Sequence, residues 1–298
     1  MINIIDKRKY FYAFSSILTM LSLILLAMWG LKLGIDFKGG TLMEAEFSQA
    51  VLSNQDIQEK LKDLNLEGLT LQSSQNNSVI LRYVSSDEEL NNKVRDKIKE
   101  LDENYQEKRL EFIGSSVSDQ IKRNAFLAVI LANLGIGIFI AWAFRKVSRP
   151  VPSWQYGIGA VVALIHDVLI TTGVFVFLGK FYNIEVGVPF IAALLTILGF
   201  SVHDTIVVYD RIRENLLKSS GKEGFEAIVN KSLNETLTRS INTSVTVLLV
   251  LLAIVIFGGD SIRYFSIALL VGIFFGTYSS IFVASALLVT SHKLKTKN

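Results

Sequence analysis

The chain has 298 residues, of which 50% are hydrophobic and 19% are charged, and it contains no cysteine. Soluble domains carry about a quarter of charged residues, so this composition favours a membrane protein. The lack of cysteine excludes disulfide bonds and thiolate chemistry, and the net charge of +3 gives no indication of nucleic-acid binding.

Six runs of the sequence carry almost no charge and reach roughly 20 residues, the length that a helix needs to cross a lipid bilayer. They are Tyr10–Leu31, Ala125–Phe144, Pro152–Gly179, Val186–Tyr209, Ser240–Gly259 and Tyr264–Ser291. The predicted fold class is therefore a polytopic α-helical membrane protein with six transmembrane helices. We expect residues 1–33 to hold the N-terminus and first helix, 34–123 a soluble domain, 124–291 the other five helices, and 292–298 a tail.

Lysine and arginine residues gather in alternate connections between these runs. Groups of them precede the first run, follow the sixth, and lie within 145–149 and 211–239, whereas the short opposite loops carry only Lys180 and Arg263. Such residues are retained on the cytoplasmic side of membranes. Both termini are therefore expected in the cytoplasm, the loops 145–154 and 210–238 likewise, and residues 34–123 outside it.

The segment 34–123 is predicted to fold as an extracytoplasmic ferredoxin-like α+β domain with the order βαββαβ. The expected elements are strand Thr41–Phe47, helix Asn54–Leu64, strands Leu69–Gln75 and Ser78–Val84 around an Asn76-Asn77 turn, a helix to about Asp102 after a Ser86/Glu89 capping box, and strand Leu110–Ile113. This scaffold carries no chemistry by itself. A docking or substrate-contact module and a simple spacer both remain open.

The residues GIDFKGG precede this domain and contain Gly34, Gly39 and Gly40. Glycine adopts backbone angles that other residues avoid. The segment is therefore interpreted as a hinge with tight turns rather than as a binding loop.

Ionisable residues inside the predicted helices mark the candidate functional site, because a charge within a bilayer is costly and usually functional. Asp204 shares one helix face with Ser201 and Thr205, and Arg239 begins the fifth helix at a similar depth. We expect Asp204 and Arg239 to meet, and a pair that forms in one conformation and separates in another would bind and release a proton. A static ion pair is the alternative.

Three further polar residues are candidates for the same proton-coupling role. Asp167 lies in the third helix without an evident partner, and Thr171 shares its face. His166 and His203 each precede an acid, so each is expected on a different helix face from that acid, as a proton carrier or as a packed polar residue.

The sixth run contains Gly272 and Gly276, whose spacing favours close packing against another helix. The two His-Asp pairs also suggest a metallohydrolase. Such enzymes need at least three converging ligands, and the sequence offers no third one in a recognisable spacing. Neither a metal site, a cofactor site nor a catalytic nucleophile is expected, and the chain is not expected to be an enzyme.

Five segments carry a family resemblance. GIDFKGGT (34–41), ALIHDVLITTG (163–173), GFSVHDTIVVYDRIREN (199–215), TRSINTS (238–244) and GTYSSIF (276–282) together resemble the SecF family of protein-export membrane proteins. The resemblance implies membership of the resistance-nodulation-division superfamily and a place in the bacterial cytoplasmic (inner) membrane. It places the family's proton-coupling acid on Asp204 and its arginine on Arg239.

The resemblance also implies partners: a SecD subunit with six similar helices, the SecYEG channel, the SecA motor and the translocating preprotein. The implied function is use of the proton motive force in late stages of protein export. A small-molecule exporter of the same superfamily and a non-transporting assembly factor of the translocon are the alternatives. Sensitivity to loss of the Asp204 charge distinguishes the assembly factor from a proton-coupled protein.

Overall fold

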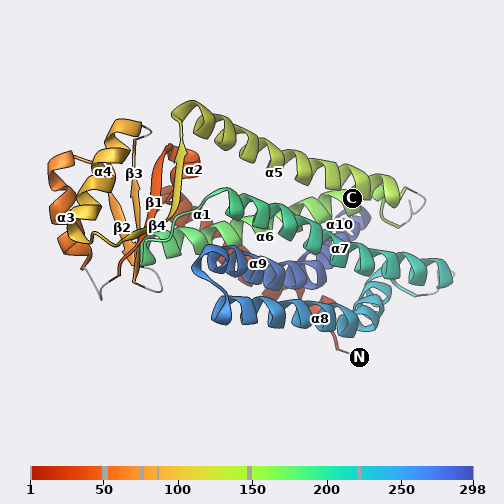
Figure 1. The fold of residues 1–298 in the computed structure, drawn as a ribbon. Helices are drawn as coiled ribbons and strands as arrows, with labels where there is room; N and C mark the ends of the chain where they lie inside the picture. Colours follow the sequence, from red (N-terminus) through yellow and green to blue (C-terminus); the bar gives the residue numbers. More distant parts are fainter. Residues whose placement is uncertain are drawn as a thin grey trace. The chain divides into compact units, whose positions relative to one another are not determined.

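The computed structural model describes residues 2–48, 53–73, 77–85, 87–145, 150–219 and 223–297. The chain divides into two compact units. The first comprises Met1–Lys32, Leu127–Ile184 and Pro189–Asn298, and the second comprises Leu33–Phe126 and Glu185–Val188. Figure 1 labels the elements of both.

Within the described residues, six helices are long and apolar enough to cross a membrane, as the composition predicts. They are α1 (Arg8–Trp29, preceded by the short η1, Ile5–Lys7), α5 (Ser115–Ala143), α6 (Ser153–Tyr182), α7 (Val188–Lys218), α8 (Phe225–Phe257), and α9 (Asp260–Ser279) with its continuation. The sixth passes through a π-helical turn, η3 (Ser280–Ala284), into α10 (Ser285–Lys297).

Two predicted boundaries are wrong. The region 210–238, expected as a loop, is mostly helical, because α7 continues to Lys218 and α8 already begins at Phe225. Hydropathy marks where a helix carries charge, not where its backbone hydrogen bonds end, and the charged residues here form ion pairs at helical spacing.

The helices of the first unit differ in how much of them is covered. In their most apolar stretches, 56% of the residues of α6 and of the sixth helix are buried, against 17% for α5 and α8 and 11% for α1. A helix that is apolar all round is normally enclosed by neighbours or lipid. α6 and α9–α10 therefore form the interior of this unit, and α1, α5 and α8 its periphery (Figure 1).

The second unit is a four-stranded antiparallel sheet with the order β2-β3-β1-β4, which is the ferredoxin-like arrangement. Its strands are β1 (Gly40–Glu46), β2 (Thr70–Ser73), β3 (Ser78–Tyr83) and β4 (Gln106–Ile113), and its main helices are α3 (Asn54–Leu61) and α4 (Glu88–Leu101). β4 is twice the predicted length. The fold class is thus confirmed.

The core of the second unit lies between one sheet face and the two helices, which Figure 1 shows on the same side of the sheet. Met43 pairs with Leu81 and Ala45 with Val79 on that face. Val94 and Ile98 of α4 pack against them, fully buried. The cap of α4 is Asp87, whose side chain accepts the Glu89 amide, and not the predicted Ser86, which lies outside the described residues.

A small polar group is buried beside this core. The Tyr83 hydroxyl donates to Asn91 Oδ1 at 2.7 Å, and Thr41 donates to the same oxygen at 3.1 Å. Burial raises the pKa of the Tyr83 phenol to about 12. The phenol therefore stays a neutral hydrogen-bond donor at physiological pH.

The segment GIDFKGG forms a single helical turn, α2 (Ile35–Lys38), between Gly34 and Gly39. Gly39 and Gly40 have φ of +75° and +129°, and a Cβ on Gly40 would lie 2.4 Å from the Tyr83 carbonyl oxygen. Gly34 has φ of −79° and makes no left-handed turn; its amide donates to the Val186 carbonyl at 2.9 Å. Asp36 accepts the amide of Val188, the first residue of α7, at 2.7 Å.

Candidate functional site

Asp204 is a buried carboxylate on α7, 7% exposed, and it lies on one face of that helix with Ser201 and Thr205, as predicted. Two hydroxyl groups donate to its carboxylate oxygens. Ser240 of α8 donates to Oδ1, and Ser280 of the π-helical turn donates to Oδ2. Three helices therefore converge on this side chain.

Asp167 on α6 is fully buried and holds a second, fuller set of partners. Ser201 of α7 donates to its Oδ2 at 2.6 Å and Ser279 of α9 donates to the same oxygen at 2.8 Å. His166 Nδ1 lies 2.9 Å from its Oδ1. The sequence shows no partner for Asp167 because its serines come from helices far along the chain.

The two histidines differ. His203 is exposed on α7, on a different face from Asp204. His166 is buried and contacts the adjacent Asp167, so the expectation that it faces away from that acid is wrong. Successive side chains of a helix diverge by about 100°, but both can turn toward one interior point. His166 Nε2 is buried without a hydrogen-bond partner among the described residues, and the ring stacks near Tyr278.

Arg239 does not reach Asp204. Its side chain is exposed, and within the described part of the chain no ion pair joins these two residues. The neighbouring residue Ser240 occupies the position facing α7 instead. Because adjacent residues point in different directions around a helix, placing Ser240 at the interface turns Arg239 away from it.

Helical spacing in the sequence predicts that Thr236, Arg239, Ser240 and Thr243 of α8 form one polar stripe, and the structure bears out only part of it. Its buried residues follow every fourth position, Ser232, Thr236, Ser240 and Ser244, whereas Arg239 and Thr243 are exposed. Sequence reasoning missed Ser244, whose hydroxyl lies within hydrogen-bond distance of the Thr277 hydroxyl of α9. The run of small polar residues at a four-residue interval was the available signal.

Gly272 and Gly276 of α9 lie directly against α7. A Cβ on Gly272 would fall 2.1 Å from Ile197 Cδ1, and a Cβ on Gly276 would fall 3.0 Å from Ser201 Cβ. The missing side chains let α9 approach α7 closely. This approach is what allows Ser279 of the same helix and Ser201 to bind one carboxylate oxygen.

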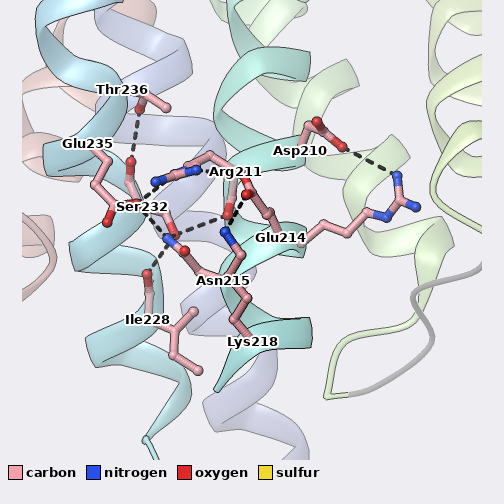
Figure 2. A network of polar contacts seen from close by, with 10 residues as sticks. Asp210, Arg211, Glu214, Asn215, Lys218, Ile228, Ser232, Glu235 and Thr236 are labelled. Carbon is pink, nitrogen blue, oxygen red and sulfur yellow. Dashed lines mark hydrogen bonds and ion pairs between the residues drawn. The ribbon is translucent and has the colours of Figure 1, made fainter. Parts of the chain in front are cut away.

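A second polar cluster joins α7 to α8 beyond the two acids (Figure 2). Arg211 pairs with Glu235 across the helices at 2.6 Å. The buried Asn215 donates to Ser232 Oγ at 2.9 Å and to Glu235 Oε2 at 2.7 Å. We call Arg211, Asn215, Ser232 and Glu235 the α7–α8 clamp. From the sequence alone, Arg211 is interpreted only as a charge that ends a membrane span.

The surroundings of Asp204 and Asp167 suit proton binding. Each acid is buried away from water. The partners of Asp204 are hydroxyl groups, and those of Asp167 are hydroxyl groups and an imidazole; among the described residues neither acid pairs with a lysine or arginine. In the part of the chain that the structure describes, no group of three or more His, Asp or Glu side chains gathers to hold a metal ion.

Together the two units define a class: a polytopic membrane protein with an α+β domain between its first two membrane helices and two acids buried among the others. Comparison with known proteins gives the family. The model "Protein export membrane protein SecD/SecF, C-terminal" matches residues 93–294, and the "SecD/SecF GG Motif" model matches residues 24–51.

Individual relatives agree. The protein translocase subunit SecF of Thermobaculum terrenum is 44% identical over 302 residues, which cover 97% of this chain and 94% of that protein. The SecF subunit of Sebaldella termitidis is 38% identical and covers 99% and 93%. The crystal structure of SecDF, a translocon-associated membrane protein from Thermus thermophilus, matches with a TM-score of 0.81 and 31% identity, over 98% of this chain and 39% of that chain.

The chain therefore belongs to the SecF family and is a protein translocation subunit of the SecDF type. GIDFKGG, with Gly39 and Gly40, lies inside the matched GG motif, and both acids lie inside the larger matched region.

Proposed function

We propose that this subunit uses the proton motive force to promote late stages of protein export through a SecYEG channel served by SecA, with Asp204 as the acid that takes up and releases the proton. The observation that carries the proposal is the burial of Asp204 between three membrane helices with hydroxyl partners. No cofactor is needed, because the coupling ion is the proton.

The energy scale suits such a role. Moving one charge through a potential of about 100 mV is worth about 2.3 kcal/mol. A buried carboxylate changes both its charge and its hydrogen bonding when it binds a proton, since the protonated form becomes a donor. Movements of α7 against α8 and the π-helical turn are then biased by the protonation state of Asp204.

Asp167 and His166 belong to the same proposed route. Asp167 accepts a hydrogen bond from Ser201, which lies on the same face of α7 as Asp204. His166 is the titratable group next to Asp167. Arg239 and His203 are exposed in this structure, so in the proposal they act at a surface of the subunit rather than inside it.

That surface supports a SecD partner. The outer residues of α1 and α5 are large and apolar, as lipid requires, for example Phe14, Ile17, Phe126 and Leu131. The exposed residues of α7 include Thr196, Gly199 and His203. Those of α8 include Arg239, Asn242, Thr243 and Thr246, beside apolar residues such as Ile241 and Val245. Polar and small residues facing outward from a membrane helix favour contact with other helices. A SecD subunit is the proposed occupant of this face.

The proposed topology follows the basic residues: the subunit lies in the bacterial cytoplasmic membrane with both termini in the cytoplasm and the ferredoxin-like domain outside. In that position the domain is available to a translocating preprotein or to an outer domain of SecD. Its exposed β4 edge and charged outer face are suited to a polar partner.

The test is Asp204→Asn, compared with Asp210→Asn as a matched control. Asparagine keeps the size and hydrogen-bonding capacity of aspartate but cannot ionise. Asp210 lies on the same helix, is exposed, and pairs with Arg213 of its own helix. In proteoliposomes with an imposed proton gradient, Asp204→Asn should reduce gradient-dependent export to background, while Asp210→Asn keeps it.

Two outcomes would support the alternatives. An assembly factor would export normally with Asp204→Asn and fail only when the subunit is absent. A small-molecule exporter of the same superfamily would leave export intact in a deletion strain and change drug susceptibility instead. Co-purification of a SecD subunit and SecYEG from native membranes separates both from the proposed function.

A further inference from the structure

The π-helical turn η3 begins at Ser280, directly after the last residue of α9, Ser279, and these two residues contact different acids. Ser279 and Ser280 are consecutive, yet Ser279 donates to Asp167 on α6 and Ser280 donates to Asp204 on α7. Neighbouring side chains of a helix point about 100° apart, so this pair reaches two acids on two different helices. Single π-helical turns within α-helices occur frequently at functional sites.

Side-chain hydroxyls support the turn at both ends. Ser285 donates to the carbonyl oxygen of Ser280 at 2.9 Å, and Tyr209 of α7 donates to the carbonyl oxygen of Ala284 at 3.3 Å. Tyr209 is fully buried, and Gly159 of α6 leaves room for its hydroxyl. The helix that carries Asp204 therefore also stabilises the turn that supplies the donor to Asp204.

Each serine has two acceptors available. Ser280 Oγ also lies 3.0 Å from the Thr277 carbonyl, and Ser279 Oγ lies 3.1 Å from the Gly276 carbonyl. An ionised carboxylate accepts the serine hydroxyl, whereas a protonated carboxyl group brings its own donor and needs it less. Each hydroxyl can thus turn from the acid to its own helix when that acid binds a proton.

We propose that Ser279 and Ser280 are positioning residues that couple the protonation of Asp167 to that of Asp204 through the π-helical turn. This inference rests on the proposed proton-coupling function of Asp204. When one acid binds a proton, its serine turns back to the helix, the turn shifts, and the hydrogen bond to the other acid changes. The two acids then act as one coupled site and not as two separate ones.

The other groups facing the two acids are few in the described structure. His166 on α6 contacts Asp167, and Tyr278 on α9 stacks near that imidazole and accepts a hydrogen bond from Ser15 of α1. From α8 the residue facing Asp204 is Ser240, and Arg239 beside it is exposed. Tyr209 contacts the turn. Ser201 of α7 also donates to Asp167. Ser279 and Ser280 are adjacent residues at the junction of α9 and η3, and between them they touch both acids.

The test measures the carboxyl titration of Asp204 by difference infrared spectroscopy on the full chain in lipid nanodiscs, using Asp204→Asn to assign the signal. Asp167→Asn should move the Asp204 midpoint by about one pH unit, a tenfold change in proton affinity. In a Ser279→Ala, Ser280→Ala background the same change should move it by less than half as much. Ser266→Ala is the control, since Ser266 is buried on α9 and its hydroxyl donates to the Ile262 carbonyl of the same helix.

Three results would overturn the inference. One is an equal Asp167→Asn shift with and without the two serine hydroxyls, which would mean that the acids interact by their charges alone. The second is no shift in either background. The third is an effect of Ser266→Ala as large as that of the double serine variant, which would show a general disturbance of α9. If the Asp204 signal does not titrate at all, the proposed function itself fails, so the two failures are distinguishable.

Discussion

Asp204 and Asp167 are buried acids that accept hydrogen bonds from serine hydroxyls of α7, α8, α9 and η3. Ser240, Ser280, Ser201 and Ser279 each donate to a carboxylate oxygen of Asp204 or Asp167. A serine hydroxyl can donate or accept, so it can serve the ionised and the protonated acid in turn, which an arginine cannot do. In the proposed function, these serine hydroxyls serve both protonation states of the two acids.

At the residue scale, the geometry of Gly40 leads to a stability prediction. Alanine there must adopt φ of +129° with its Cβ 2.4 Å from the Tyr83 carbonyl oxygen. We expect Gly40→Ala to lower the free energy of unfolding of the ferredoxin-like unit by about 1–3 kcal/mol. Hydrogen exchange of the β1 and β3 amides in the full chain measures this. Gly114→Ala is the control, because a Cβ on Gly114 meets nothing within 4 Å, and an equal loss there would contradict the argument.

Helical spacing predicts which residues of one helix share a face, and so it identified Asp204 with Ser201 and Thr205. It cannot predict partners across helices. The two serines that bind Asp167 lie 34 and 112 residues away along the chain, and their positions depend on the packing of α7 and α9. The same limit explains Arg239: its distance along α8 suited a pair with Asp204, but the direction of its side chain is set by which neighbour packs inward.

At the element scale, α7 and α8 form a pair fixed at two levels. The first contact is the hydrogen bond from Ser240 to Asp204. The second is the α7–α8 clamp, which joins the two helices where both continue as regular helix (Figure 2). Ser232 of the clamp and Ser240 belong to the same buried stripe of α8, so one face of that helix meets both the clamp residues and Asp204.

Loss of one clamp residue gives an element-scale prediction. Asn215→Ala removes a buried amide that bonds to Ser232 and Glu235 on α8, and it should lower the free energy of unfolding by about 1–3 kcal/mol. Glu214→Gln is the control. Glu214 is half-exposed and pairs with Arg211 and Lys218 of its own helix, so Glu214→Gln should leave the stability nearly unchanged.

Thermal unfolding of the full chain in detergent measures both variants. A larger effect for Glu214→Gln than for Asn215→Ala would mean that charges at the surface of α7, and not the contact with α8, stabilise this region.

The elements themselves were largely predictable because apolar length and period-two alternation have direct physical causes. The π-helical turn was not. The residues Ser280–Ala284 contain no proline or glycine that would mark a break, and the turn depends on a hydroxyl of Tyr209 from another helix. The cap of α4 was displaced by one residue because Asp87 and Ser86 are both good caps and only the backbone conformation selects between them.

At the scale of the whole molecule, composition and charge distribution predicted a six-helix membrane unit and a separate α+β unit, and both are present. The inclusion of Glu185–Val188 in the second unit was not predictable. Those residues follow a membrane helix in sequence but form a bridge with Leu33 and bonds with Gly34 and Asp36. Such pairing of distant short segments leaves no periodic signal in the sequence.

The proposed orientation in the membrane gives the last prediction: by the distribution of basic residues, we expect the ferredoxin-like unit to lie outside the cytoplasm. The chain has no cysteine, so single cysteines can be labelled without background. Lys60→Cys, on the accessible surface of α3, should react with a membrane-impermeant thiol reagent added to intact spheroplasts, whereas Lys218→Cys at the exposed end of α7 should react only after permeabilisation. Ala163→Cys, fully buried in α6, should react in neither case. Labelling of Lys60→Cys only after permeabilisation would show that the orientation is the reverse of the predicted one. The domain would then lie on the side away from the proposed exit of the preprotein.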